Sequence, residues 1–120
     1  MCIRDRSPNG AFNVPEFGTV NNADQFRAMH AYSPYHRVKD GTRYPAVMFL
    51  TGANDPRVDP MQSRKMAARL QAASNALGPV LLRTSASSGH GFGTALSEQI
   101  EQEVDVYAFL FSHLGMTFKP

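Results

Sequence analysis

The sequence has little cysteine, little net charge and no long apolar run, and each shortage excludes a class of protein. A single cysteine, Cys2, rules out an internal disulfide framework and supplies no metal site by itself. So few cysteines fit a cytoplasmic location and leave a periplasmic one open. Lysine and arginine are spread singly and give a net charge of only +2, which argues against nucleic acid as a partner. No apolar run reaches the roughly 18 residues of a membrane span, so no membrane partner is expected.

The length limits the chain to one domain's worth of structure. With 120 residues, 42% of them hydrophobic, it can bury a modest core. Residues 1–7 match nothing in the pattern that follows, and we expect a non-native leader outside the fold. The folded part is then expected to be residues 8–120.

Two short apolar runs define the fold class. Residues 46–50 and 79–84 are β-rich and lack polar alternation, which is typical of parallel strands buried on both faces. A helical pattern lies between them, with Asp59 as an expected cap and Pro60 at the first helical position. A strand, a helix and a strand in this order predict a parallel sheet and an α/β fold.

The remaining segments are assigned by their turn formers and helical spacing. Residues 8–18 are rich in turn formers and are expected to form a loop, whose Phe12 and Phe17 either pack on the sheet or line a pocket. A short helix is expected over residues 23–31, capped by Asn21 or Asn22. Residues 36–43 are expected to be a solvated connection, and a long amphipathic helix is expected to stop at Gly115.

An aspartate and a histidine follow the two predicted strands. Asp55 and His90 each lie just past a carboxyl end, so both side chains are expected at the same edge of the sheet. A carboxylate beside an imidazole in that position is what a nucleophilic triad needs, because it holds the imidazole tautomer. The alternative is a turn residue, since Asp55-Pro56 is also a turn dipeptide.

Four blocks of sequence, in order and with fitting spacing, resemble the carboxy-terminal part of the prolyl oligopeptidase family of serine peptidases. The resemblance covers about residues 8–114, and the blocks are residues 31–36, 44–48, 51–65 and 88–91. It implies the carboxy-terminal portion of an α/β-hydrolase fold with an incomplete sheet. It also implies a serine endopeptidase that hydrolyses peptide bonds after proline and has a β-propeller that restricts access.

The resemblance assigns roles to individual residues. Asp55 resembles the triad aspartate, which would orient the histidine. His90 resembles the triad histidine, which would transfer the proton. Arg57 resembles an arginine that binds a substrate carbonyl, and Val58 resembles a wall of the proline pocket. Phe17 falls where the family has an aromatic pocket residue, with Phe12 as the other candidate in that loop. No cofactor and no metal are expected.

The nucleophile of that family is missing. It lies on a Gly-x-Ser-x-Gly elbow, but the only glycines four apart here are Gly89 and Gly93, with Gly91 in the serine position. Ser85, Ser87 and Ser88 lie on the histidine's own loop, without an elbow. We therefore expect a catalytically silent fragment that lacks the upstream part of the catalytic domain and the propeller.

Two other functions stay open. Other α/β-hydrolase peptidases and esterases share the placement of Asp55 and His90, and a substrate panel would separate them. A non-catalytic binding module that keeps the hydrolase scaffold would explain the missing elbow. For the expected peptidase fragment, the unpaired sheet edge left by the missing strands predicts marginal solubility.

Overall fold

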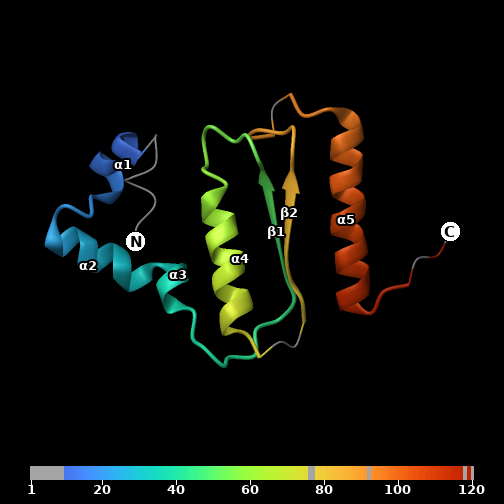
Figure 1. The fold of residues 1–120 in the computed structure, drawn as a ribbon, viewed down its shortest axis with the longest axis horizontal. Helices are drawn as coiled ribbons and strands as arrows, with labels where there is room; N and C mark the ends of the chain where they lie inside the picture. The colour runs from blue at the N-terminus through green and yellow to red at the C-terminus, as the bar shows by residue number, and fades with distance from the viewer. Residues whose placement is uncertain (1–9, 76–77, 92, 118, 120) are drawn as a thin grey trace. The chain divides into compact units, whose positions relative to one another are not determined.

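The computed structural model describes residues 10–75, 78–91, 93–117 and 119 (Figure 1). The expected leader therefore lies outside the described residues. The chain divides into two compact units, residues 1–40 and 41–120. Its elements are α1 (Gly10–Phe17), α2 (Ala23–Tyr32), α3 (Pro34–Arg37), β1 (Val47–Gly52), α4 (Met61–Ala73), β2 (Val80–Ser85) and α5 (Leu96–Leu114).

The first unit begins with a helix where the sequence predicted a loop. Pro15 lies inside α1, where it removes one backbone donor and leaves the other bonds of a short helix in place. Gly18 adopts a left-handed conformation, with φ of 82°, and its N–H donates to the Val14 carbonyl at 2.8 Å. Gly18 therefore ends the helix. In the sequence, this sign of a helix end was outweighed by the turn formers around it, which favoured a loop. Phe12 on this helix is 89% exposed, so it is not packed against its own unit.

The second helix starts as predicted. The Asn22 side chain accepts hydrogen bonds from the N–H groups of Asp24 and Gln25, which satisfies two free donors of the first turn. Ser33 lies before Pro34 and ends α2 in an extended conformation, as expected. Pro34 then opens the short helix α3, so the segment expected to be a plain connection is partly helical.

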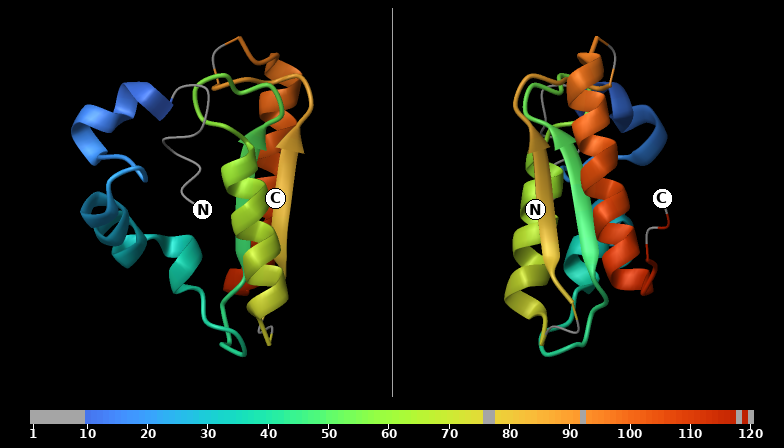
Figure 2. Two further views of the ribbon diagram at one scale, coloured as in Figure 1. Left: turned by 60° about the vertical axis from the view of Figure 1, so that its left-hand side comes forward. Right: turned by 90° about the vertical axis from the view of Figure 1, so that its right-hand side faces the viewer.

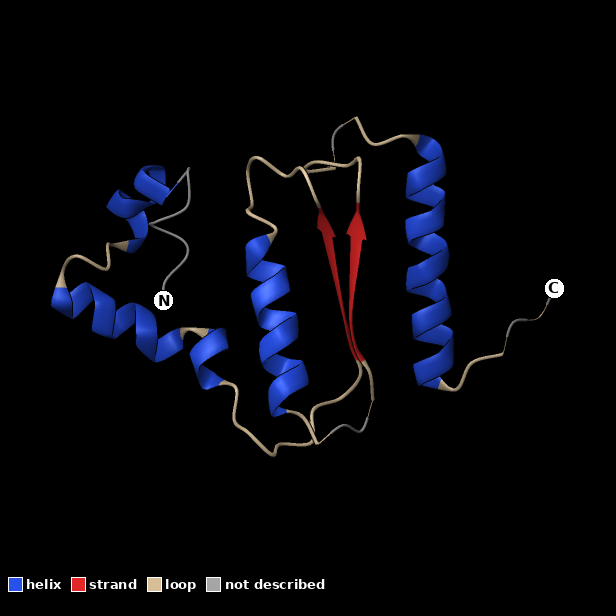
Figure 3. Ribbon diagram, viewed as in Figure 1, coloured by secondary structure: helices blue, strands red, loops and turns tan. Residues whose placement is uncertain are grey.

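The second unit contains the predicted strand–helix–strand motif (Figure 3). β1 and β2 pair in parallel, in a register that runs from Val47 opposite Val80 to Gly52 opposite Ser85. Helices α4 and α5 lie on opposite sides of this sheet in all three views (Figures 1 and 2). Asp59 accepts the Met61 N–H at 2.8 Å, so it stabilises the start of α4 one residue later than predicted.

The core of this unit is small and lies on the α4 side of the sheet. Ala67, Leu70 and Ala73 on one face of α4 are buried, as is Val80 at the start of β2. The prediction that both strands are buried on both faces was wrong. Leu50 is 41% exposed because its side of the sheet faces an open cavity rather than a packed helix.

An ion pair joins helix α5 to the sheet. The Arg83 Nε on β2 donates to the Asp105 carboxylate on α5 at 2.7 Å. None of the α5 residues is buried, although Gly115 ends the helix in the predicted left-handed conformation. Among the described residues, no helix combines the length and the apolar character that crossing a bilayer requires.

Candidate functional site

The loops that follow β1 and β2 meet at one edge of the sheet. Beyond the last paired residues, the Ala53 N–H donates to the Ser85 carbonyl at 2.8 Å, and the Asn54 N–H donates to the Ser88 carbonyl at 3.3 Å. These bonds continue the contact between the strands into the loops. Asp55 and His90 are thereby brought to the same edge, as the parallel topology predicted.

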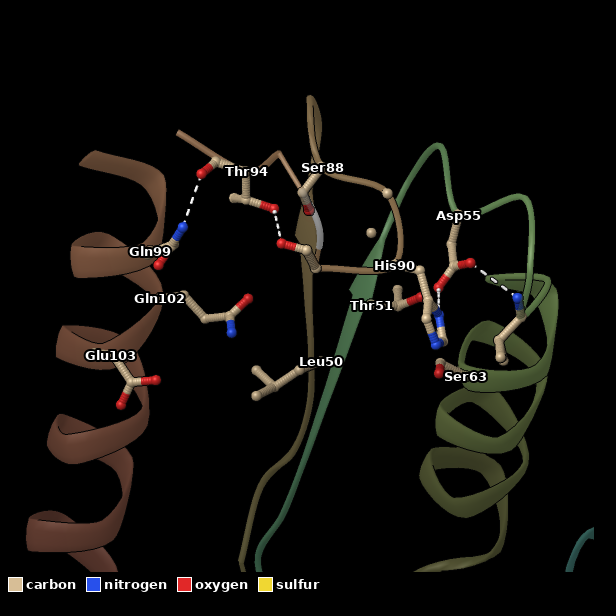
Figure 4. Close-up of a pocket in the computed structure, with 14 residues that line it drawn as sticks. Leu50, Thr51, Asp55, Ser63, Ser88, His90, Thr94, Gln99, Gln102 and Glu103 are labelled. Atoms are coloured by element: carbon tan, nitrogen blue, oxygen red, sulfur yellow. Dashed lines mark hydrogen bonds and ion pairs between the residues drawn. The ribbon is translucent and has the colours of Figure 1, made fainter. Parts of the chain in front are cut away.

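The Asp55 carboxylate binds the His90 ring directly (Figure 4). Its Oδ2 lies 2.8 Å from Nδ1 of His90, and its Oδ1 accepts the N–H groups of Arg57 and Val58, each at 2.8 Å. The Asp55 side chain is 10% exposed, while that of His90 is 37% exposed. One carboxylate oxygen therefore fixes the turn, and the other orients an imidazole that stays accessible.

The contacts of Asp55 favour its charged form. Burial raises the pKa of Asp55, but hydrogen bonds from the Val58 N–H, the His90 ring and the Arg57 N–H lower it further than burial raises it. The net result is a pKa below the ordinary aspartate value of 3.8. At neutral pH this carboxylate is ionised and holds the Nδ1 of His90 by a charge-assisted hydrogen bond.

A cavity of about 510 Å³ opens beside the His90 ring. The end of β1 contributes Leu50 and Thr51 to its wall, and the start of α4 contributes Ser63 (Figure 4). Gln99, Gln102 and Glu103 of α5 line the facing wall. The cavity is large enough for a peptide-sized group, and it places the imidazole where a reacting atom could approach.

The residues predicted to bind substrate are distributed differently from the triad pair. Val58 lines the cavity. Arg57 is exposed, and its backbone N–H holds the Asp55 carboxylate. Phe17 lies on α1 in the first unit. The substrate-binding roles of these three residues stay predictions.

The hydroxyl groups of Ser85, at the end of β2, and of Ser87, on the histidine loop, are hydrogen-bonded away from the imidazole. The Ser85 hydroxyl accepts from the Arg83 guanidinium at 2.6 Å, and the Ser87 hydroxyl bonds the Glu98 carboxylate. Within the described part of the chain, no hydroxyl is hydrogen-bonded to His90. Nor do the described residues gather three or more metal-ligating side chains of the His, Cys, Asp or Glu type.

Sequence reasoning missed two contributions to this edge. Gly52 must be glycine, because a Cβ there would lie 2.5 Å from the Ser88 carbonyl oxygen and at least as close to that of Gly89. The polar wall of α5 was missed because that helix was assessed by its apolar residues alone. The run Glu98 to Glu103, in which only Ile100 is apolar, was the available signal.

Comparison with known proteins identifies what this chain resembles. A sequence model described as "Prolyl oligopeptidase family" matches residues 4–117. The chain is 33% identical over 108 residues to a prolyl endopeptidase of Elizabethkingia meningoseptica and covers 15% of that protein with 89% of its own length. It is 37% identical over 106 residues to a prolyl endopeptidase of Dictyostelium discoideum, covering 14% of it with 86% of its own length.

Solved structures give the same result. One structure, from a study of two prolyl endopeptidases, superimposes with a TM-score of 0.83 at 41% identity, over 90% of this chain and 16% of that one. Another is prolyl oligopeptidase B of Galerina marginata, solved as a mutant with a 35mer hydrolysis and macrocyclization substrate. It superimposes with a TM-score of 0.86 at 27% identity, over 97% of this chain and 16% of that one. The chain thus spans about 15% of the length of the curated relatives it matches.

Proposed function

Because this chain belongs to the prolyl oligopeptidase family, we propose that it is the carboxy-terminal part of a serine peptidase catalytic domain that hydrolyses peptide bonds after proline. The observation that carries the proposal is the 2.8 Å contact between Asp55 and His90 at the carboxyl edge of a parallel sheet. The structural neighbours are α/β-hydrolase domains of that family, and the two-stranded sheet is an incomplete version of theirs.

His90 is the general base and acid of the proposed reaction. With Nδ1 protonated and bound to Asp55, its Nε2 is free to take the proton of a serine hydroxyl as that oxygen attacks the substrate carbonyl. The imidazolium that forms is stabilised by the ionised Asp55 carboxylate. It then returns the proton to the leaving amine, so His90 ends the step neutral.

The serine is supplied by a part of the protein outside these 120 residues. The sequence has no Gly-x-Ser-x-Gly elbow, and no hydroxyl of the described residues is hydrogen-bonded to His90. The elbow of an α/β-hydrolase also provides a backbone N–H to the oxyanion hole. The isolated chain is therefore proposed to be inactive.

Val58, Arg57 and Phe17 complete the proposal on the substrate side. Val58 lies on the cavity wall beside Asp55 and presents an apolar surface. Arg57 directly follows the Asp55-Pro56 turn and would hydrogen-bond a substrate carbonyl, while Phe17 would add an aromatic wall. A proline ring carries no charge or donor, so an apolar and aromatic pocket is the receptor that fits it.

The test uses a longer protein that contains this chain and an upstream Gly-x-Ser-x-Gly segment. We expect it to cleave a proline-containing peptide, and His90→Ala to reduce kcat by about 10⁴-fold or more. His113→Ala, on the last turn of α5, is the matched control and should keep the activity. Cleavage of esters but not of peptides would point to an esterase. Activity that survives His90→Ala would overturn the proposal, and inactivity of the longer protein on every substrate would favour a binding module.

A further inference from the structure

A side-chain bond links the two loops that carry the candidate pair. The Asn54 amide Nδ2 donates to the Ala86 carbonyl at 2.9 Å, across 32 positions of sequence. Asn54 immediately precedes Asp55, and Ala86 is the first residue after β2. The bond therefore ties the aspartate loop to the base of the histidine loop.

The backbone alone holds the two loops weakly at this point. The last short backbone bond, from the Ala53 N–H to the Ser85 carbonyl at 2.8 Å, lies on the strand side of both loops. The next one, from the Asn54 N–H to the Ser88 carbonyl, is 3.3 Å long, beyond the usual range for such bonds. The Asn54 side chain thus makes the shortest described link between the loops beyond the strand ends, apart from the Asp55–His90 contact itself.

The far side of the histidine loop is anchored to a different element. The Ser87 hydroxyl bonds the Glu98 carboxylate, and Gln99 Nε2 donates to the Thr94 carbonyl at 2.7 Å. Both bonds draw the loop toward α5, while Asn54 holds it against the aspartate loop. Without the Asn54 side-chain bond, the backbone contact that remains between the loops beyond Ala53 is the long bond from the Asn54 N–H to the Ser88 carbonyl at 3.3 Å, while the bonds to α5 are unchanged.

We infer that Asn54 is a positioning residue that holds His90 at hydrogen-bond distance from Asp55 by binding the Ala86 carbonyl. The inference deepens the proposed function and rests on it for its catalytic meaning. The half-triad is then preassembled by this chain, before the nucleophile is added. Asn54 acts through Asp55 and His90 and does not itself touch the reacting atoms.

The experiment measures the His90 ring in the 120-residue chain, by nitrogen-15 NMR of histidine-labelled protein at a concentration where it is monomeric. The His90→Ala variant assigns the ring among the four histidines. In the unmodified chain we expect a low-field Nδ1–H resonance, because that proton is bound to a carboxylate. In Asn54→Ala we expect this resonance to be lost.

Gln71→Ala is the matched control. Gln71 Nε2 donates to the Val80 carbonyl at 2.8 Å, so the variant removes the same kind of amide-to-carbonyl bond from the opposite end of β2. It should keep the resonance. If Asn54→Ala does not fold, Asn54→Leu decides, because it roughly keeps the size of the side chain, removes the donor and adds no charge beside Asp55.

The outcomes separate the inference from the proposed function. Loss of the resonance in the Asn54 variant alone supports the inference, even if no longer protein cleaves peptides. Retention in a folded Asn54 variant overturns it while leaving the peptidase proposal intact. Loss in both variants overturns it as well, because the effect would then be general loosening. Absence of the resonance from the unmodified chain would overturn the preassembled pair itself.

Discussion

At the residue scale, Asp55 satisfies two interpretations that its sequence context left as alternatives. A turn residue needs an acceptor for the N–H groups that follow it, and Oδ1 accepts those of Arg57 and Val58. A triad aspartate needs an acceptor for the imidazole, and Oδ2 meets Nδ1 of His90. The turn therefore positions the second oxygen, so the structural role of Asp55 is a condition for its proposed catalytic role.

The lowered pKa of Asp55 predicts a pH dependence of stability. A carboxyl group with a lower pKa in the folded state stabilises that state at pH values above its unfolded pKa. The contribution is lost as the pH falls through the folded pKa. We expect the difference in free energy of unfolding between the unmodified chain and Asp55→Asn to be largest near neutral pH, and to shrink below pH 3.8.

Urea denaturation at a series of pH values measures this difference. Asp24→Asn is the control, because the Asp24 side chain is 88% exposed on α2. A difference for Asp55→Asn that stays constant down to strongly acidic pH would contradict the assigned contacts. His90 is the titratable group that faces this carboxylate, so the comparison is repeated in a His90→Ala background.

Gly52 gives a second prediction at this scale. Gly52→Ala places a Cβ against the Ser88 and Gly89 carbonyl groups, which must move, and with them the histidine loop. We expect a loss of about 1–3 kcal/mol in the free energy of unfolding, as for other overpacked sites. Gly89→Ala is the control on the same loop, since a Cβ there would lie 3.5 Å from the nearest atom, the Asn54 carbonyl oxygen. Equal losses in the two variants would contradict the steric argument.

Asp55 and His90 could be predicted from the sequence because each is a chemically distinctive residue that follows an apolar run. Asn54 could not be predicted, because an asparagine before an aspartate is common in turns of every kind. Gly52 could not be predicted either, since only the path of the loop after β2 shows which carbonyl groups lie against its Cα. Long-range contacts of this kind depend on coordinates rather than on local pattern.

At the scale of elements, the strand–helix–strand motif followed from apolar runs with a capped helix between them. The helix α1 did not follow, since Pro15 and its neighbours are turn formers and only Gly18 marks a helix end. The burial of β1 was overestimated for a different reason. A continuous apolar run indicates that a strand can be buried on both faces. In the described part of this unit, however, the buried apolar residues lie on the α4 side of the sheet.

Helix α5 carries an apolar stripe that predicts self-association of the isolated chain. Val104 is 60% exposed and Tyr107 is 56% exposed, and they lie one turn apart on the stripe that Ile100, Leu110 and Leu114 continue. Exposed apolar patches of this kind promote association. We expect sedimentation to show oligomers that grow with concentration.

A double variant, Val104→Lys with Tyr107→Lys, should shift the chain toward the monomer without a loss of helix content. Glu101→Lys is the matched control, because it also adds positive charge to α5 at an exposed position off the stripe. A monomeric unmodified chain at all concentrations would contradict the prediction. Equal effects of the double variant and of Glu101→Lys would assign the change to net charge instead.

At the scale of the whole molecule, the chain is a small share of each relative that it matches. It covers 15% of the Elizabethkingia meningoseptica protein, while 89% of the chain aligns with it. The second unit has a two-stranded sheet with an exposed Leu50, an open cavity beside His90 and an apolar stripe on α5. All three are surfaces that a larger domain would cover, which fits the proposed carboxy-terminal part of a catalytic domain.

This proposal predicts complementation in trans. The upstream remainder of a longer protein, expressed separately with its serine elbow, should hydrolyse proline-containing peptides only when this chain is added. The reason is that the elbow would provide the nucleophile and this chain would provide the oriented base, so neither part alone can transfer the proton. His90→Ala in the added chain should abolish the recovered activity, whereas His113→Ala should not. If the upstream part is fully active by itself, His90 is not its base. If the two parts bind but stay inactive while the continuous protein is active, the Asp55–His90 pair is not preassembled in this chain.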